Sequence, residues 1–288
     1  MHMLVAAGMA AALVATAKGT DTDAEPARLR GLVREVQAAD YRGERAELRR
    51  LASALDGIRE PGLAAPASYW KGFALWRRAI NGFNETPVPS DLRADLEAAV
   101  ASFRTALDRQ PGWIEPKIGI SGCLMSLLYL AREDAAWRKD LLDQFRPLWA
   151  ETSAQGADNP RMLWLLGGMQ FGAPPPVGGD TPKAIATLRK GLEAARREAL
   201  VSPSPSDAGF APTWGAAENL MNLAYIYSQG AGENRAVARA YAEGALAVAP
   251  DWHYVRDILL VQIDTIPKAG ALRRVLAGGR LARTRAAP

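Results

Sequence analysis

The chain has 288 residues, of which 49% are hydrophobic and 23% charged, and its formal net charge is +4. Much of the positive excess lies near the C-terminus, in Arg273, Arg274, Arg280, Arg283 and Arg285. The rest of the chain is close to neutral, so charge does not indicate nucleic-acid binding. Alanine and leucine are abundant and the sequence has no run of alternating strand pattern, which predicts a helical fold with a substantial core.

Residues 1–17 form an apolar run that ends in Ala15-Thr16-Ala17, an A-x-A cleavage pattern. This pattern predicts a signal peptide and a periplasmic or secreted protein. Two alternatives stay open, namely an N-terminal helix of a cytoplasmic protein and an uncleaved leader that attaches the protein to a membrane. The first is disfavoured because the run is apolar on all sides, and the second because it is shorter than the ~20 residues of a membrane span.

Residues 18–26 are small and polar and are expected to form a linker. Apolar residues then recur at helical spacing in two short segments, one with Leu29, Leu32, Val33 and Val36 and one with Leu48, Leu51, Leu55 and Ile58. The turn Tyr41-Arg42-Gly43 separates them. We therefore expect a helical hairpin here, covering the N-terminal end of a helical array that extends over residues 27–266.

A second helical pair is expected from Pro66 to Pro111, with a long loop over Asn84 to Pro89. Ser90 follows this loop and is the expected N-cap of the next helix. That helix carries the clearest amphipathic stripe in the chain, formed by Leu92, Leu96, Ala99, Val100, Phe103, Ala106 and Leu107.

A third pair follows Pro111. The segment Gly119-Ile-Ser-Gly-Cys123 superficially resembles a serine nucleophile elbow, but it lacks the second glycine two residues after the serine and lies inside a helical pattern. A close helix contact through small residues is the preferred interpretation. Cys123 is the only cysteine, which excludes an internal disulfide.

The fourth pair opens at Asn159-Pro160, an N-cap followed by proline at the first helical position. Its loop, Gly172 to Asp180, is rich in proline and glycine and permits two interpretations. Asp180 is a polar group presented to a ligand, or Asp180 or Thr181 caps the helix that starts at Pro182. The second interpretation is slightly favoured.

A fifth pair ends at Pro250, a sixth begins at Trp252, and residues 267–288 are expected to form a basic helix or tail.

Two segments share one plan, and they identify the kind of array. Each has an alanine, a second alanine seven residues later followed by leucine, and a proline five residues after that second alanine: Ala99, Ala106, Leu107 and Pro111 in one, and Ala238, Ala245, Leu246 and Pro250 in the other. The two prolines lie close to four periods of ~34 residues apart. The chain therefore resembles tetratricopeptide repeat (TPR) proteins over about residues 67–266. The resemblance implies an all-α solenoid of antiparallel helix pairs forming a superhelix.

In TPR proteins the first helices of the pairs line a concave groove that binds peptides or partner proteins. The resemblance places in this groove Lys71, Arg78, Glu115, Met125, Arg161, Trp164, Phe171, Glu218, Met221, Tyr225 and Gln229, and Asp180 is added from the loop. Arg161, Trp164, Tyr225 and Glu218 are expected to form one surface that suits a peptide-like or acidic ligand. For the aromatic residues, packing against a neighbouring helix is an equally good interpretation.

Enzymatic chemistry is not indicated by the residues. His2 and His253 are the only histidines, so no histidine metal cluster can form, and no phosphate-binding glycine loop is present. We expect a non-catalytic binding or scaffold protein without cofactor or metal, whose partner is a protein or peptide or, alternatively, a small molecule. A second hypothesis is an accessory subunit of an envelope transport complex that encloses an apolar ligand.

Overall fold

The computed structural model describes residues 24–201, 209–230 and 234–265, and within these residues every regular element is helical. The α-helices are α1 (Ala24–Tyr41), α2 (Arg45–Leu55), α3 (Ala64–Gly82), α4 (Leu92–Arg109), α5 (Ile114–Leu130), α6 (Ala135–Gln155), α7 (Pro160–Gly172), α8 (Thr181–Leu200), α9 (Ala216–Ser228), α10 (Arg235–Val248) and α11 (Leu260–Thr265). Shorter helical segments are η2 (Pro61–Leu63), η3 (Ala131–Glu133), η4 (Pro175–Val177) and the π-helical η6 (Tyr254–Leu259).

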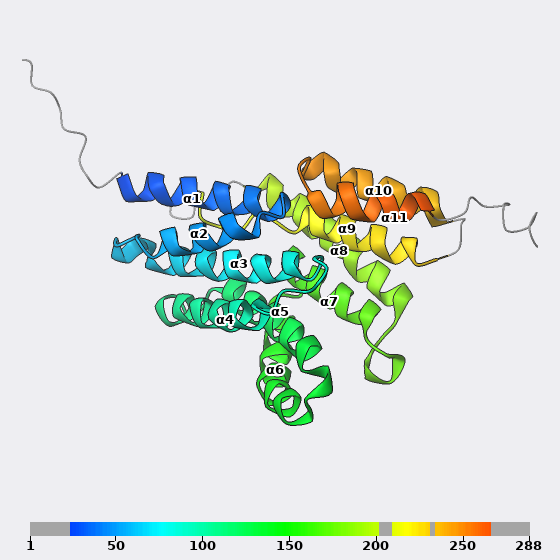
Figure 1. Ribbon diagram of the computed structural model, residues 1–288, viewed down its shortest axis with the longest axis horizontal. Coiled ribbons are helices and arrows are strands. Elements are labelled where there is room, and N and C mark those ends of the chain that lie inside the picture. Colours follow the sequence, from blue (N-terminus) through cyan, green and yellow to red (C-terminus); the bar gives the residue numbers. More distant parts are fainter. Residues whose placement is uncertain (1–23, 202–208, 231–233, 266–288) are drawn as a thin grey trace, which may run out of the picture.

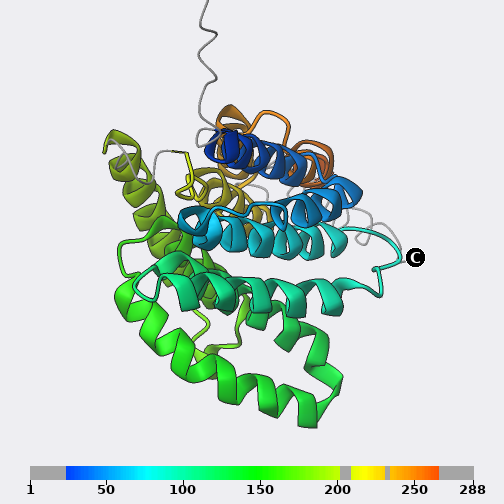
Figure 2. The ribbon, with the colours of Figure 1, turned by 90° about the vertical axis from the view of Figure 1, so that its left-hand side faces the viewer.

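The helices form antiparallel pairs that stack in the order of the chain (Figures 1 and 2). The odd-numbered helices α3, α5, α7 and α9 each pack against the preceding and following even-numbered helix, and also against one another. The fold is therefore the all-α, solenoid-like array that the sequence predicts. We call α3, α5, α7 and α9 the inner helices.

Several helices begin where a polar side chain accepts the first free backbone N–H groups. Asn159 Oδ1 accepts hydrogen bonds from the N–H groups of Arg161 and Met162, at 2.9 and 3.2 Å, as predicted. Asp180 accepts from the N–H of Lys183 at 2.9 Å and caps α8, so the preferred interpretation of this residue is confirmed. The expected N-cap at Ser90 is wrong by one residue, because Asp91 precedes α4 and its carboxylate binds arginines instead of the helix N-terminus.

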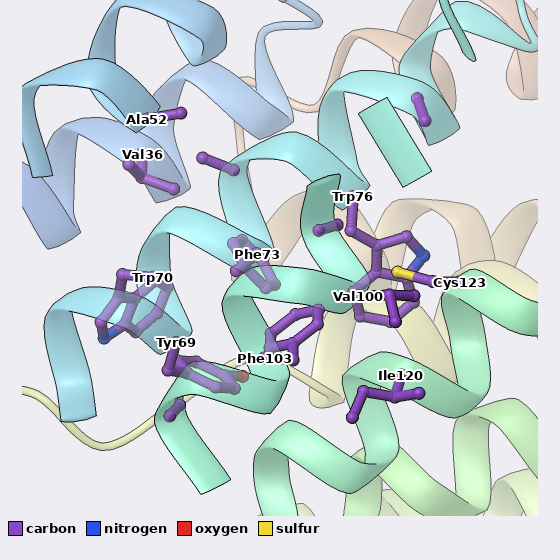
Figure 3. Packing of buried hydrophobic residues seen from close by; sticks show 14 of the residues in the cluster. Val36, Ala52, Tyr69, Trp70, Phe73, Trp76, Val100, Phe103, Ile120 and Cys123 are labelled. Carbon is purple, nitrogen blue, oxygen red and sulfur yellow. The ribbon is translucent and has the colours of Figure 1, made fainter. Parts of the chain in front are cut away.

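Small residues allow α3, α4 and α5 to approach closely around Phe103, which is fully buried (Figure 3). A Cβ atom added at Gly72 or Gly119 would lie 2.9 or 2.5 Å from the Phe103 ring, so only glycine fits at these positions without movement. Gly122 has the same relation to Trp76, at 2.3 Å. Ala99 and Ala106 are also fully buried, which confirms that the repeated alanines lie at helix contacts.

The C-terminal pair α9 and α10 uses smaller side chains. Ala238, Ala242 and Ala245 of α10 are fully buried. Tyr241 of α10 stacks on Tyr227 of α9, with ring centroids 5.7 Å apart. The second copy of the repeated plan therefore has the same structural role as the first.

The segment before α9 passes through the centre of the array. Phe210 O accepts a hydrogen bond from the indole of Trp70 at 2.8 Å, and the Trp214 indole donates to the Tyr69 hydroxyl at 3.2 Å. Helix α1 lies beside the C-terminal helices (Figure 1), and Tyr41 at its last position packs on Trp252 before η6, with ring centroids 5.2 Å apart. These contacts join segments that are far apart in the sequence.

Three expected segments lie wholly or mostly outside the described residues. They are the leader at residues 1–17, the linker at 18–26 and the basic tail at 267–288. Helix α1 begins at Ala24, so the last residues of the expected linker are helical. The stretch Ile114–Glu133 is long and apolar enough to cross a membrane, but 61% of its apolar 18-residue window is buried within the protein, where the stretch forms the central helix α5 and the following η3.

Candidate binding groove

Five neighbouring hollows lie along the inner helices and share walls. Near α9, one of about 290 Å³ is lined by Arg77, Ile80, Asn81, Phe83, Asn84, Trp164, Met221, Asn222, Tyr225, Trp252 and Tyr254. It shares Trp164, Ile80 and Asn222 with a smaller hollow of about 170 Å³, which reaches Met125, Ser126 and Gly168. These last residues also border two larger hollows, of about 610 and 630 Å³.

The larger hollows lie on either side of Met125 and Tyr129. One of them is also lined by Phe83, Val88 and Arg132. The other is lined by residues of α6, α7 and the following loop, including Phe145, Met169, Pro174 and Val177. At the opposite end, Asn84, Tyr225 and Tyr254 lead into a more polar hollow of about 650 Å³ that includes Gln229 and Thr265. We call this continuous, half-open series of hollows the groove.

The groove contains five of the residues predicted from the sequence. Trp164 lies at its centre, Met125 borders three hollows, Met221 and Tyr225 line the part over α9, and Gln229 lines the polar end. Four of them lie on inner helices, and Gln229 directly follows the last residue of α9. These five residues therefore line the same series of hollows, and their role in binding stays a prediction.

Arg161 does not belong to the groove, and its predicted role there is corrected. The side chain is only 3% exposed and donates to Glu115 at 2.8 to 3.0 Å, to Glu198 at 2.8 Å and to the Trp214 carbonyl at 3.1 Å. Burial alone would lower the pKa of Arg161, but Glu115 and Glu198 raise it, so the guanidinium is charged. Arg161 and Glu115 therefore join α5, α7, α8 and the segment before α9.

Glu218 is likewise part of a buried cluster, so its predicted place on the binding surface is also wrong. It is fully buried, accepts from the Tyr41 hydroxyl at 3.0 Å and from the N–H of Gly215 at 2.7 Å, and lies 4.0 Å from Arg77. Arg77 Nε donates to Asp40 Oδ2 at 2.7 Å. Burial raises the pKa of Glu218, although Arg77 opposes this. The cluster connects α1, α3 and α9.

The two other predicted cations are also paired within the protein. Arg78 is buried and binds Asp91 and Asp95, beside Arg45. Burial alone would raise the pKa of Asp91, but hydrogen bonds from Arg45 and Arg78 lower it to about 2. Lys71 Nζ lies 2.7 Å from Asp56 and does not line the groove. Neither residue supplies charge to the groove.

Phe171 and Asp180 have structural roles. Phe171 packs edge-on against Tyr225, with ring centroids 5.9 Å apart, and so supports a groove residue from behind. Asp180 caps α8, and its N–H donates to Gln170 O at 2.7 Å. The loop that ends at Asp180 nevertheless contributes Ala173, Pro174 and Val177 to a wall of the groove.

Sequence reasoning missed several groove residues. Phe83 and Tyr129 lie at the C-terminal ends of α3 and α5 and pack edge-on at 5.8 Å, and Tyr129 is 59% exposed. Asn222 lies next to the predicted Met221. The two loops that are longer than a TPR turn, at residues 84–89 and 172–180, both line the groove. Their unusual length was therefore a usable signal.

Some hydrogen-bond donors at the groove have no partner among the described residues. These are Trp164 Nε1 and Arg77 Nη1, both buried, and Trp76 Nε1 beside the smallest hollow. The Asn222 side chain also makes no hydrogen bond within this part of the chain, and it is half-buried between two hollows. The three nitrogens are shielded from solvent, so a ligand in the groove does not reach them, whereas the half-buried Asn222 side chain borders two hollows and can donate to an acceptor there.

His253 is the one histidine in the described residues, and it lies outside the groove. Its Nδ1 lies 2.7 Å from Asp257 Oδ2 one helical turn away, and both side chains are exposed. Hydrogen bonds from Arg256 and His253 lower the pKa of Asp257 to about 2. Within the described ranges, no group of three or more His, Cys, Asp or Glu residues could hold a metal ion.

Comparison of the chain with family models, with curated proteins and with solved structures finds no match.

Proposed function

We propose that this protein is a non-catalytic binding protein that holds an extended peptide segment of a partner protein in the groove. The observation that carries this proposal is the continuity of the hollows across α3, α5, α7 and α9, where they share Met125, Trp164 and Tyr225. A small molecule would fill one hollow, whereas a chain of several residues would use the whole series.

The lining suits the side chains of a peptide. Phe83, Met125, Tyr129 and Met169 offer apolar and aromatic area, and aromatic side chains give large contact area at low entropic cost. Methionines adapt their shape to different partners. The groove therefore favours apolar side chains of the bound segment at its α5 end.

The centre of the groove suits a peptide backbone. The Asn222 amide borders the same hollow as Arg77. Arg77 is neutralised by Asp40 and lies near Glu218, so this site has no net positive charge. A neutral acceptor such as a main-chain carbonyl fits the Asn222 amide better than an anion.

The resemblance to TPR proteins agrees with this proposal and remains part of it. Export is also part of the proposal, on the basis of the apolar run and the A-x-A pattern at residues 1–17.

The alternative function, an accessory transport subunit that encloses an apolar ligand, requires an enclosed cavity. The hollows of the groove open to solvent, so no observation favours that alternative.

The test is a selection from a displayed library of random dodecapeptides on the full chain. We expect enriched peptides that bind the wild-type protein and lose most of their affinity for Met125→Arg, because Met125 borders three hollows. Met125 is half-buried at the groove surface, where a long arginine side chain can reach solvent.

The matched control is Val237→Arg, which makes the same kind of change at a 39% exposed position of α10, outside the groove. Val237→Arg should bind the selected peptides like the wild type, and both variants should keep the wild-type thermal unfolding midpoint. Failure to enrich any peptide, or equal binding by Met125→Arg and the wild type, would refute the proposal.

A further inference from the structure

We infer that the segment bound in the groove is acidic, with two carboxylates three or four residues apart that bind Arg138 and Arg146 at the α6 end. This inference rests on the proposed function and adds the charge and spacing of the partner sequence. It follows from the charges that border the groove.

Every charged residue that lines the five hollows is an arginine: Arg77, Arg132, Arg138 and Arg146. Arg77 is neutralised by Asp40, with Nε and Oδ2 2.7 Å apart. Arg132 lines one of the two larger hollows, and Arg138 and Arg146 line the other. The charged side chains in this lining are therefore positive, and charge complementarity favours a negative partner.

Arg138 and Arg146 have free charges in the part of the chain that the structure describes. Both are exposed, and neither has a carboxylate within the 4.0 Å of an ion pair there. The nearby Asp143 is bound to Lys139 at 2.8 Å. Arg132 is the weaker candidate, since it lies 3.8 Å from Glu133 and also packs over the Tyr129 ring.

The spacing of the two arginines predicts the spacing of the ligand charges. Arg138 and Arg146 border the same hollow from positions eight residues apart on α6, which corresponds to ~12 Å along a helix that rises ~1.5 Å per residue. An extended chain covers this distance in three or four residues, at ~3.4 Å per residue. The apolar floor between them, which includes Phe145 and Met169, would hold an apolar side chain from the intervening residues.

The first measurement is the composition of the dodecapeptides selected on the wild-type chain. We expect enrichment of Asp and Glu, in pairs three or four residues apart around an apolar residue. The same selection on Arg138→Glu/Arg146→Glu should instead enrich Lys and Arg. Selected peptides without acidic enrichment would overturn the inference, while their loss of binding to Met125→Arg would still support the groove.

The second measurement is the affinity of the most enriched peptide, by fluorescence anisotropy, beside a version with Gln or Asn in place of its acidic residues. The acidic peptide should bind the wild type about fivefold more tightly at low salt, since two exposed ion pairs contribute this much. This ratio should fall to about one in Arg138→Gln/Arg146→Gln and stay unchanged in the control Arg34→Glu/Arg196→Glu, which alters exposed arginines of α1 and α8.

The outcomes separate the inference from the proposed function. Equal affinity of the acidic and amide peptides, both weakened by Met125→Arg, would overturn the charge preference and leave the groove intact. Peptides that bind Met125→Arg as well as the wild type would refute both. The arginine variants are at exposed positions, and unchanged thermal unfolding would confirm that a change in affinity comes from binding.

Discussion

The helical array has a packed interior side and a groove side, and the same residue types have different roles on the two sides. On the packed side, Arg78 and Arg161 are buried and bound by Asp91, Asp95, Glu115 and Glu198. On the groove side, Arg138 and Arg146 are exposed and have no bound carboxylate among the described residues. A charge that the fold has already paired cannot serve a ligand, so only the second group is available for binding.

The aromatic residues divide in the same way. Tyr69, Trp70 and Phe103 fill the interior (Figure 3). Tyr129 and Tyr225 are instead exposed and border the groove. Changes on the packed side should therefore lower stability, and changes on the groove side should lower affinity at nearly constant stability.

Arg161→Ala should have the largest effect on stability. It leaves the carboxylate of Glu115, which is 5% exposed, without its arginine, and breaking a buried ion pair in this way costs about 3–5 kcal/mol. Chemical denaturation measures the free energy of unfolding. Arg146→Ala on the groove side is the control and should change it by less than about 0.5 kcal/mol. Similar changes in the free energy of unfolding for the two variants would contradict the distinction between the packed side and the groove side.

Gly119→Ala should lower the free energy of unfolding by about 1–3 kcal/mol, because the added Cβ would lie 2.5 Å from the Phe103 ring. Gly31→Ala in α1 is the matched control, since nothing lies within 4 Å of its Cβ, and it should stabilise the protein by up to about 1 kcal/mol. Denaturation of both variants in urea decides the matter, and a neutral Gly119→Ala would mean that α4 and α5 are less closely packed.

Glu218→Gln should produce a smaller change that depends on pH. Burial raises the pKa of Glu218 above its ordinary value of 4.5, so its contribution favours folding below that value and is lost as the pH rises through the folded-state pKa. The variant stays neutral, so its stability relative to the wild type should increase between pH 4 and the neutral range. A stability difference that is constant with pH would show that Glu218 keeps its ordinary pKa.

Tyr225→Ala should have the smallest effect on stability, about 1 kcal/mol or less, because the side chain is 37% exposed and loses mainly its edge contact with Phe171. The same change should weaken the binding of a selected peptide. Thermal unfolding and anisotropy on the same sample separate the two effects. A large loss of stability would show that Tyr225 belongs to the packed side and not to the groove side.

The helical pairs and their contacts could be predicted from the sequence because they depend on local spacing. Alanines seven residues apart, with Phe103 between Ala99 and Ala106, indicate a close helix contact wherever the pair lies in the fold. The caps at Asn159 and Asp180 are local in the same sense. These features do not depend on how the helical pairs stack on one another.

Local spacing could not predict whether a charged residue on an inner helix faces the interior or the groove. Arg161 is buried because Glu115, Glu198 and the carbonyl of Trp214 meet there, and Trp214 belongs to a segment that enters the centre from a distant part of the chain. Glu218 is covered by Tyr41 of the first helix. The repeat spacing places both residues on an inner helix. Their burial follows only from contacts with segments that are far away in the sequence.

The most direct test of the groove is hydrogen–deuterium exchange of the full chain with and without a selected dodecapeptide. We predict that the peptide slows exchange at the C-terminal ends of α3 and α5, around Phe83 and Met125, and in α7 near Met169. The backbone amides of α4 and α10, which do not line the groove, should exchange at the same rate as in the free protein. Slowed exchange in α4 and α10, with none around Met125, would contradict the account.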